Sequence, residues 1–511
     1  MATSPAQFRW PQGFVLALAL GLIGALTYLM LASGWPAPHL DSVLYFQLSS
    51  HVAAGDGFLF SNYSRLYFAR GVDNWLFDLH GQLFWPLLGW LSPGSDYSAL
   101  LRGAALLSVI TFFLSAGLAL LITRALALKP WLRVGVVLAL ALGLSFISVS
   151  LMGRPEQGIG VVLVLAAIAR QLRPHWDAAL IQGATIGLIA AFSPLAGVLA
   201  GALYAWLGAL DHPPRKALLF VLRLGLSALG TWALLIILVS PFWPWEILRN
   251  TLMQFLSAYG SGYMSRMYVL WELSVDPRKP GIALAWLLAG SLVIFQAARS
   301  RANGYRWAVT LVGGLLVALL LYKTSMERTL TYNFIGLALI PLERAWQIWT
   351  SLDLSARKRR IGAAVIALAC ALPGLGFVDA LLSWQSYRHA GATLAEAQHA
   401  LAPYLAKMAP SERIVVSEVS VPPLFLLEAR PKQMVSVADL TAEQVGQVEQ
   451  AFSIQARYAI LPPWMASSVL PNLSNYRVVE NFPSSCADPL GCQVPGYAFL
   501  LLERVPIAGT R

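Results

Sequence analysis

Long apolar stretches alternate with short polar connections along most of this chain of 511 residues. A helix needs roughly 20 consecutive apolar residues to cross the hydrocarbon core of a bilayer. The pattern therefore predicts a polytopic α-helical membrane protein with about 11 transmembrane helices, at 13–33, 99–123, 131–150, 157–171, 177–192, 194–210, 217–240, 281–298, 307–322, 330–349 and 361–382. The first stretch has weak signal-peptide character, with Ala-Ser-Gly at 32–34 resembling a cleavage site. Its apolar run is long for a signal peptide, so we interpret it as a retained helix.

Two connections are too long to be simple turns. Residues 34–98 and 241–280 mix aromatic and apolar side chains with charged ones, over runs too short to span a membrane. This composition is typical of amphipathic helices that lie in the membrane interface. We expect both segments to be external interfacial helices and group them with the spans as one transmembrane domain, residues 1–384.

The pattern changes after about residue 385. Short runs with strand patterning occur at 412–419, 432–437, 457–461 and 497–505, and a Thr-x-x-Gln start predicts a helix at 441–452. We therefore predict a soluble C-terminal α/β domain at 385–511. Within it, Cys486 and Cys492 flank a turn-forming sequence. Outside the membrane they could form a small-loop disulfide, and the alternative is two free thiols.

Charge is sparse and unevenly placed. Only 12% of the residues are charged, 57% are hydrophobic, and the net charge is +11. Basic residues concentrate in alternate connections, which face the cytoplasm if the N-terminus does. This distribution explains the net charge without nucleic-acid binding, and an odd number of spans then puts the C-terminal domain outside. The three cysteines imply no metal cluster.

Polar candidates for a site gather on the outer side. Ionisable groups at the edge of the hydrocarbon are costly, so they often mark function. Asp41 follows the first span, and the other candidates lie in later outer connections or at the start of the tenth span: Asp73, His80, Arg154, Glu156, Arg266, Lys323, Arg328 and Tyr332. Each also has a structural explanation: a helix-end charge for Asp41, an ion pair for Arg154 with Glu156, a loop hydrogen bond for His80, flanking or solvated charge for the others and packing for Tyr332.

Four stretches carry a resemblance to a known family. They are LDSVLYF at 40–46, LHGQLFWPLLGWL at 79–91, GRPEQGIGVVLVLAAIA at 153–169 and RTLTYNFIGLALIPL at 328–342. With the spans and the external C-terminal domain, they resemble the GT-C superfamily of integral membrane glycosyltransferases. That superfamily includes protein O-mannosyltransferases, lipid A aminoarabinose transferases and mycobacterial arabinosyltransferases, which place an acidic residue just after the first span.

The resemblance implies a sugar donor linked to polyprenyl phosphate and an acceptor that is a glycan, a lipid or a protein. Asp41 would be the general base that takes the proton from the acceptor hydroxyl. A fixed cation would stabilise the departing phosphate, with arginine preferred over Lys323 for its bidentate fork. A single displacement inverts the anomeric centre. The site would face the periplasm from the inner membrane of a bacterium.

One departure from the family concerns metal binding. Its members often carry Asp-Asp or Asp-Glu where this chain has Asp41 followed by Ser42. A divalent metal is therefore doubtful, and no cofactor is firmly implied. The main alternative function is a polytopic lipid or sugar transporter or flippase, because such proteins also gather charges within the bilayer. A non-catalytic assembly or receptor protein is a further alternative.

Overall fold

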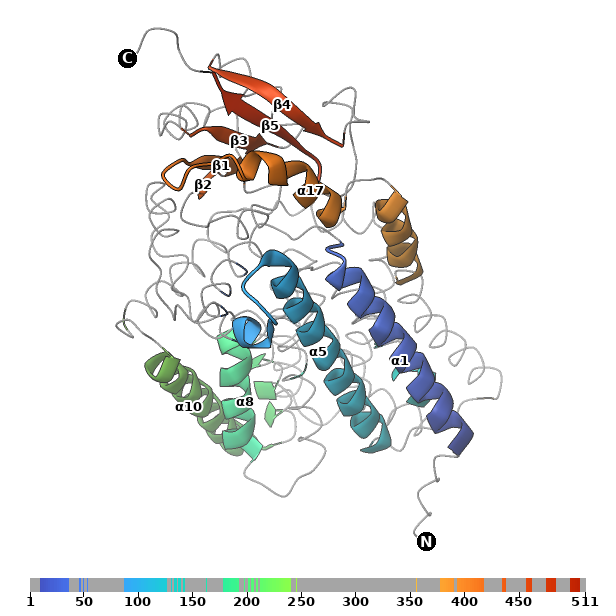
Figure 1. Ribbon diagram of the computed structural model, residues 1–511. Helices are drawn as coiled ribbons and strands as arrows, with labels where there is room; N and C mark the ends of the chain where they lie inside the picture. The colour runs from blue at the N-terminus through green and yellow to red at the C-terminus, as the bar shows by residue number, and fades with distance from the viewer. Residues whose placement is uncertain are drawn as a thin grey trace.

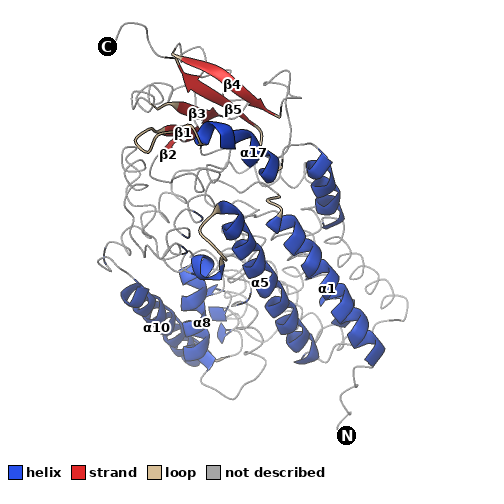
Figure 2. Cartoon of the chain, viewed as in Figure 1, coloured by secondary structure: helices blue, strands red, loops and turns tan. Residues whose placement is uncertain are grey.

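The computed structural model describes less than half of the chain, in separate segments. These are residues 10–35, 87–125, 178–192, 212–239, 377–389, 393–417, 434–437, 456–461, 475–483 and 497–505, with isolated positions or short runs within 46–53, 130–142 and 197–209 and at 162, 245 and 355. Helices and strands among them are distinguished in Figure 2.

Long apolar helices make up the first part of the fold. Helices α1 (Trp10–Ala32), α5 (Tyr97–Ala125) and α10 (Pro214–Val239) are, among the described residues, the three that are long and apolar enough to cross a membrane. They confirm the spans predicted at 13–33, 99–123 and 217–240. The shorter apolar helix α8 (Ala178–Phe192) coincides with the segment predicted at 177–192. The other predicted spans fall wholly or mostly outside the described residues, so their number stays a prediction.

These helices expose apolar side chains. On α1, Phe14, Leu18 and Leu22 are each more than half exposed, and they recur every four residues along one face. On α10, Leu222, Leu226 and five other leucine or isoleucine side chains are also more than half exposed. A soluble protein would not leave such continuous apolar stripes in water, whereas lipid is an apolar solvent that suits them.

Small residues bring neighbouring helices close together. Helices α1 and α5 pack side by side, and a Cβ added at Gly24 of α1 would lie 3.0 Å from Phe113 Cζ of α5. Helices α8 and α10 also pack together, as Figure 1 shows. There, Gly183 and Gly187 of α8 are spaced as in the small-xxx-small motif of membrane helices. A Cβ at either position would collide with the backbone of α10, so glycine permits this contact.

A five-stranded sheet forms the C-terminal part. Its strands are β1 (Ile414–Ser417), β2 (Met434–Val437), β3 (Tyr458–Leu461), β4 (Tyr476–Phe482) and β5 (Phe499–Arg504), in the order β2-β1-β3-β5-β4. The first three strands are parallel, and β5 is antiparallel to both β3 and β4. All four residues of β3 are buried, as expected of a central strand.

Four strands lie within segments that the sequence pattern predicts, whereas β4 was not predicted. Strand β4 lies at the edge of the sheet and its first six residues are exposed or only partly buried, so its sequence has a weaker apolar signal than that of β3 or β5. Three predictions are not tested by the described residues. They are the helix at 441–452, the domain boundaries and the disulfide between Cys486 and Cys492.

Helix α17 (Leu394–Leu405) covers the sheet. Thr393 and Glu396 form a capping box at its start: the Glu396 N–H donates to Thr393 Oγ1, and the Thr393 N–H donates to Glu396 Oε2. Leu394, Ala397 and Leu401 form its buried face. In Figure 1 the sheet and α17 lie beyond the adjacent ends of α1 and α5. One continuous buried cluster joins the two parts, from Met30 and Leu31 of α1 to side chains of β5.

Candidate functional site

The end of α1 has a defined geometry. Gly34 has a positive φ of 83°, its N–H donates to Leu31 O at 3.0 Å, and the Trp35 N–H donates to Met30 O at 3.2 Å. This pair of bonds is the Schellman motif, in which a glycine in the left-handed region ends a helix and reverses the chain direction. Trp35 packs against the buried cluster that contains Met30. The path of the chain as it leaves α1, seven residues before Asp41, is therefore fixed locally.

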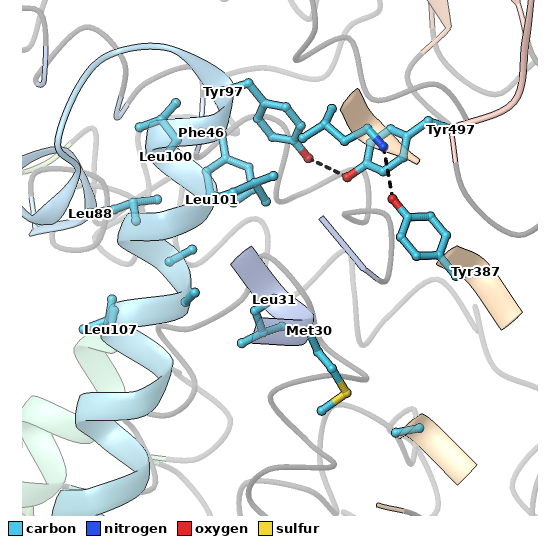
Figure 3. Packing of buried hydrophobic residues seen from close by; sticks show 14 of the residues in the cluster. Met30, Leu31, Phe46, Leu88, Tyr97, Leu100, Leu101, Leu107, Tyr387 and Tyr497 are labelled. Atoms are coloured by element: carbon cyan, nitrogen blue, oxygen red, sulfur yellow. Dashed lines mark hydrogen bonds between the residues drawn. The ribbon is translucent and has the colours of Figure 1, made fainter. Parts of the chain in front are cut away.

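Tyr497 joins this turn to the C-terminal sheet. Its hydroxyl donates to Gly34 O at 2.7 Å, and it lies 3.2 Å from the hydroxyl of Tyr97, the first residue of α5. A hydroxyl has one proton to donate. Since that of Tyr497 is directed at Gly34, Tyr97 donates to Tyr497. Both tyrosines are fully buried, and Figure 3 shows them facing each other above Leu31 and Met30. We call Gly34, Tyr97 and Tyr497 the tyrosine clamp.

A second contact holds the same turn from another side. The indole N–H of Trp384 donates to Ser33 Oγ at 2.9 Å, and the Ser33 hydroxyl donates to Met30 O at 2.7 Å. Trp384 belongs to the helical residues 377–389, which precede α17. Two segments more than 340 residues away along the chain thus converge on the last two residues of the α1 turn.

The start of α17 packs on the clamp. The Leu394 N–H donates to the Tyr387 hydroxyl at 3.1 Å, and this bond is drawn in Figure 3. A Cβ added at Gly34 would lie 3.3 Å from Leu394 Cβ. Burial raises the pKa of Tyr387 to about 12 and raises that of Tyr497 well above its ordinary value. Both hydroxyls are therefore neutral at physiological pH, in keeping with the hydrogen bonds that they make.

A residue that follows Asp41 in the sequence, Phe46, also contacts the clamp. Phe46 is buried, and its ring packs edge-on against Tyr97 with the centroids 5.8 Å apart. The segment between Trp35 and Phe46 thus has both ends beside the clamp. Asp41 belongs to this segment of the sequence.

The predicted site residues themselves lie outside the described part of the chain. They are Asp41, Asp73, His80, Arg154, Glu156, Arg266, Lys323, Arg328 and Tyr332, together with Ser42. Their mutual arrangement stays a prediction. Within the described segments, no group of three or more His, Cys, Asp or Glu side chains could hold a metal ion.

The clamp was not predicted from the sequence. A glycine just past an apolar helix is a common signal for its end, so Gly34 carries a local signal. Tyr97 and Tyr497 carry none, because their contact joins positions 400 residues apart and no periodic pattern marks it.

The chain is similar to two solved membrane proteins. The first is ArnT from Cupriavidus metallidurans bound to undecaprenyl phosphate, with a TM-score of 0.52 and 15% identity over 98% of this chain and 99% of that chain. The other is the oligosaccharyltransferase of Archaeoglobus fulgidus tethered to an acceptor peptide, with a TM-score of 0.49 and 13% identity over 92% of this chain and 72% of that chain. No protein-family model matches the chain, and no curated protein matches its sequence.

The likeness to ArnT covers nearly the whole of both chains and shows that this chain shares the overall fold of that membrane protein. It confirms, at the level of the fold, the resemblance that the four sequence stretches carry.

Proposed function

We propose that this protein is a membrane glycosyltransferase that moves a sugar from a polyprenyl-phosphate carrier to an acceptor hydroxyl at the outer face of the membrane. The observation that supports it most is the tyrosine clamp. Two distant parts of the chain bond directly to the turn that leads to Asp41, through Tyr497 and Trp384, and Tyr97 bonds to Tyr497. This support suits a catalytic group that must be kept in position. A charge that only marked a helix end would need no such support.

Asp41 is the general base in this proposal. Its carboxylate takes the proton of the acceptor hydroxyl while that oxygen attacks the anomeric carbon. The bond from that carbon to the phosphate oxygen breaks, and the polyprenyl phosphate leaves with the electron pair. One displacement inverts the anomeric centre. The leaving phosphate is a weak base, so the step requires no general acid.

Cations stabilise the charge that develops on the phosphate. The candidates are Arg154, Arg266, Lys323 and Arg328, and the guanidinium fork can bind two phosphate oxygens at once. The other proposed substrate-binding residues are Asp73, His80, Glu156 and Tyr332. Ser42 replaces the second acidic residue of the family's pair, so no step of the proposed reaction passes through a metal ion.

The carrier and the location are part of the same proposal. The ArnT structure is described as bound to undecaprenyl phosphate, which supports a polyprenyl-phosphate carrier here. We place the N-terminus in the cytoplasm and the C-terminal sheet in the periplasm of a bacterium, with the protein in the inner membrane. The sugar is a hexose or a pentose, and the acceptor is a glycan, a lipid or a protein.

The main alternative function is a flippase for the same lipid. An assay in detergent distinguishes a flippase from a transferase. Lipid extract from cells that lack the protein supplies the accumulated donor, and envelope extract from those cells supplies the acceptor. Purified protein is added in detergent micelles, which have no two leaflets, and lipids are followed by mass spectrometry. A transferase consumes one polyprenyl-phosphate sugar and releases polyprenyl phosphate. A flippase leaves the lipids unchanged, and that result would overturn the proposal.

A further inference from the structure

A groove of about 620 Å³ lies against the helical residues 377–389. The described side chains that line it are Leu381, Trp384, Gln385, Arg388 and His389. They come from two successive turns of one helix and change in character along it. Leu381 and Trp384 are apolar, whereas Gln385, Arg388 and His389 are polar or basic. The groove therefore has an apolar end and a basic end.

The basic end is held in place by a chain of contacts. The Arg388 guanidinium carbon lies 5.4 Å from the centroid of the Trp384 ring, at the distance of a cation–π contact. The Trp384 ring is fixed in turn, because its N–H donates to Ser33 Oγ. Arg388 thus reaches the groove from an oriented aromatic surface, while the rest of its side chain remains exposed. An ordered guanidinium loses less conformational entropy when it binds an anion.

The groove lies at the level of the membrane interface. Ser33, which Trp384 contacts, follows directly on the last residue of the membrane-spanning helix α1. Tryptophan is enriched at this level, and cationic side chains beside it contact lipid headgroups. Arg388 lies one turn beyond Trp384, on the side away from the span. With the end of α1 at the membrane surface, the apolar end of the groove would lie at acyl-chain depth and the basic end at phosphate depth.

We propose that this groove binds the phosphate headgroup of an anionic glycerophospholipid of the outer leaflet. Arg388 pairs with the phosphate, Gln385 and His389 offer further hydrogen bonds to the headgroup, and the start of an acyl chain lies on Leu381 and Trp384. The charge of the groove and its change from apolar to basic favour this occupant. The binding is separate from the transfer reaction and requires none of the residues assigned to it.

The test titrates phospholipid into the purified full-length protein in detergent, with native mass spectrometry as the readout. Dioleoylphosphatidylglycerol is the probe and dioleoylphosphatidylcholine is the zwitterionic comparison. Loss of a charged hydrogen bond weakens binding about tenfold, so Arg388→Gln is expected to weaken the first phosphatidylglycerol site by about that factor. Arg102→Gln is the matched control. Arg102 is an exposed arginine in the first turns of α5, the end of that helix that carries Tyr97, and it does not line the groove.

Three results would overturn the proposal. One is equal phosphatidylglycerol binding by wild-type protein and Arg388→Gln, and another is equal binding of the two phospholipids. The third is displacement of phosphatidylglycerol by a lower concentration of polyprenyl phosphate, which would assign the groove to the sugar carrier instead.

His389→Gln supplies a second variant of the groove, with a smaller loss of phosphatidylglycerol affinity expected than for Arg388→Gln. Thermal unfolding of each variant without added lipid verifies that the fold is intact. No sugar donor is present, so the outcome is independent of the transferase proposal.

Discussion

The Tyr497 hydroxyl donates a hydrogen bond to the backbone oxygen of Gly34 over a distance of 2.7 Å, although the two residues are 463 positions apart. Gly34 ends the first membrane helix, and Tyr497 stands two residues before β5 of the C-terminal sheet. The sheet is thus attached directly to the turn that precedes Asp41. Through this contact the C-terminal part supports the proposed catalytic segment.

Replacing Tyr497 with phenylalanine removes the hydroxyl and keeps the ring. The loss leaves buried polar groups of Gly34 and Tyr97 without this partner, which costs about 1–3 kcal/mol. We expect a lower unfolding temperature in detergent and slower sugar transfer at matched protein levels. The control is Tyr476→Phe, which removes a hydroxyl that donates to Ala456 O, away from α1. Equal effects of the two variants on transfer would contradict a positioning role for Tyr497.

Gly34→Ala tests the turn itself. The φ of 83° is in the left-handed region, which costs a residue with a Cβ roughly 1–2 kcal/mol. The added Cβ would also lie 2.7 Å from the Tyr497 oxygen. We expect lower thermal stability and loss of transfer activity. Gly21→Ala on α1 is the matched control, because nothing lies within 4 Å of its added Cβ. The interpretation of the turn is wrong if Gly34→Ala is as stable and active as the control.

Gly187→Ala tests the packing of α8 against α10. The new Cβ would lie 2.8 Å from Thr231 Cβ and even closer to the Ala228 oxygen, so the helices must move apart. Overpacking of this kind costs about 1–3 kcal/mol. We expect a lower unfolding temperature in detergent. Gly230→Ala on α10 should change it little, since its added Cβ meets nothing within 4 Å. A Gly187→Ala protein as stable as wild type would refute the close contact.

Stability should fall at alkaline pH. A tyrosine is neutral when protonated, and burial raises the pKa of folded Tyr387 from an ordinary 10.0 to about 12. A group whose pKa is higher in the folded protein than in the unfolded chain stabilises the fold while it is protonated. This stabilisation is complete at pH values below the unfolded pKa, and it is lost as the pH rises through the folded pKa. The unfolding temperature should therefore drop between about pH 10 and pH 12, together with a late rise in tyrosinate absorbance. Tyr387→Phe should reduce that drop, and an unchanged drop would exclude Tyr387 as a source.

The sequence predicts the membrane helices well because each carries its own signal. The sequences of α1, α5 and α10 are apolar over a full bilayer thickness. A helix that crosses lipid must have this property in its own residues, so it can be read from a short stretch of sequence. The parallel strands β1 and β3 also have continuous apolar runs, since they are buried on both faces. Asp41 was singled out because it lies within ten residues of the end of such a run.

Long-range contacts could not be predicted in this way. Ser33 gives no indication that Trp384 donates to it, and Tyr97 looks like any interfacial aromatic residue at the start of a span. Helix α17 was missed although its capping box is complete, because its apolar face consists of only a few positions within a polar segment. The groove beside Arg388 was missed for a related reason: two turns of one helix with mixed composition are common in sequences, and only the folded chain shows that Trp384 is oriented by Ser33.

The most direct test compares the rate of polyprenyl phosphate release by wild-type protein, Asp41→Asn and Ser42→Ala in the detergent assay. Asparagine keeps the size of the side chain but cannot accept the proton, and general-base catalysis contributes about 10²–10⁴-fold to rate. We predict a loss within that range for Asp41→Asn with unchanged thermal stability, and a rate near that of wild type for Ser42→Ala. Release by Asp41→Asn at the wild-type rate would contradict the assignment of Asp41 as the base.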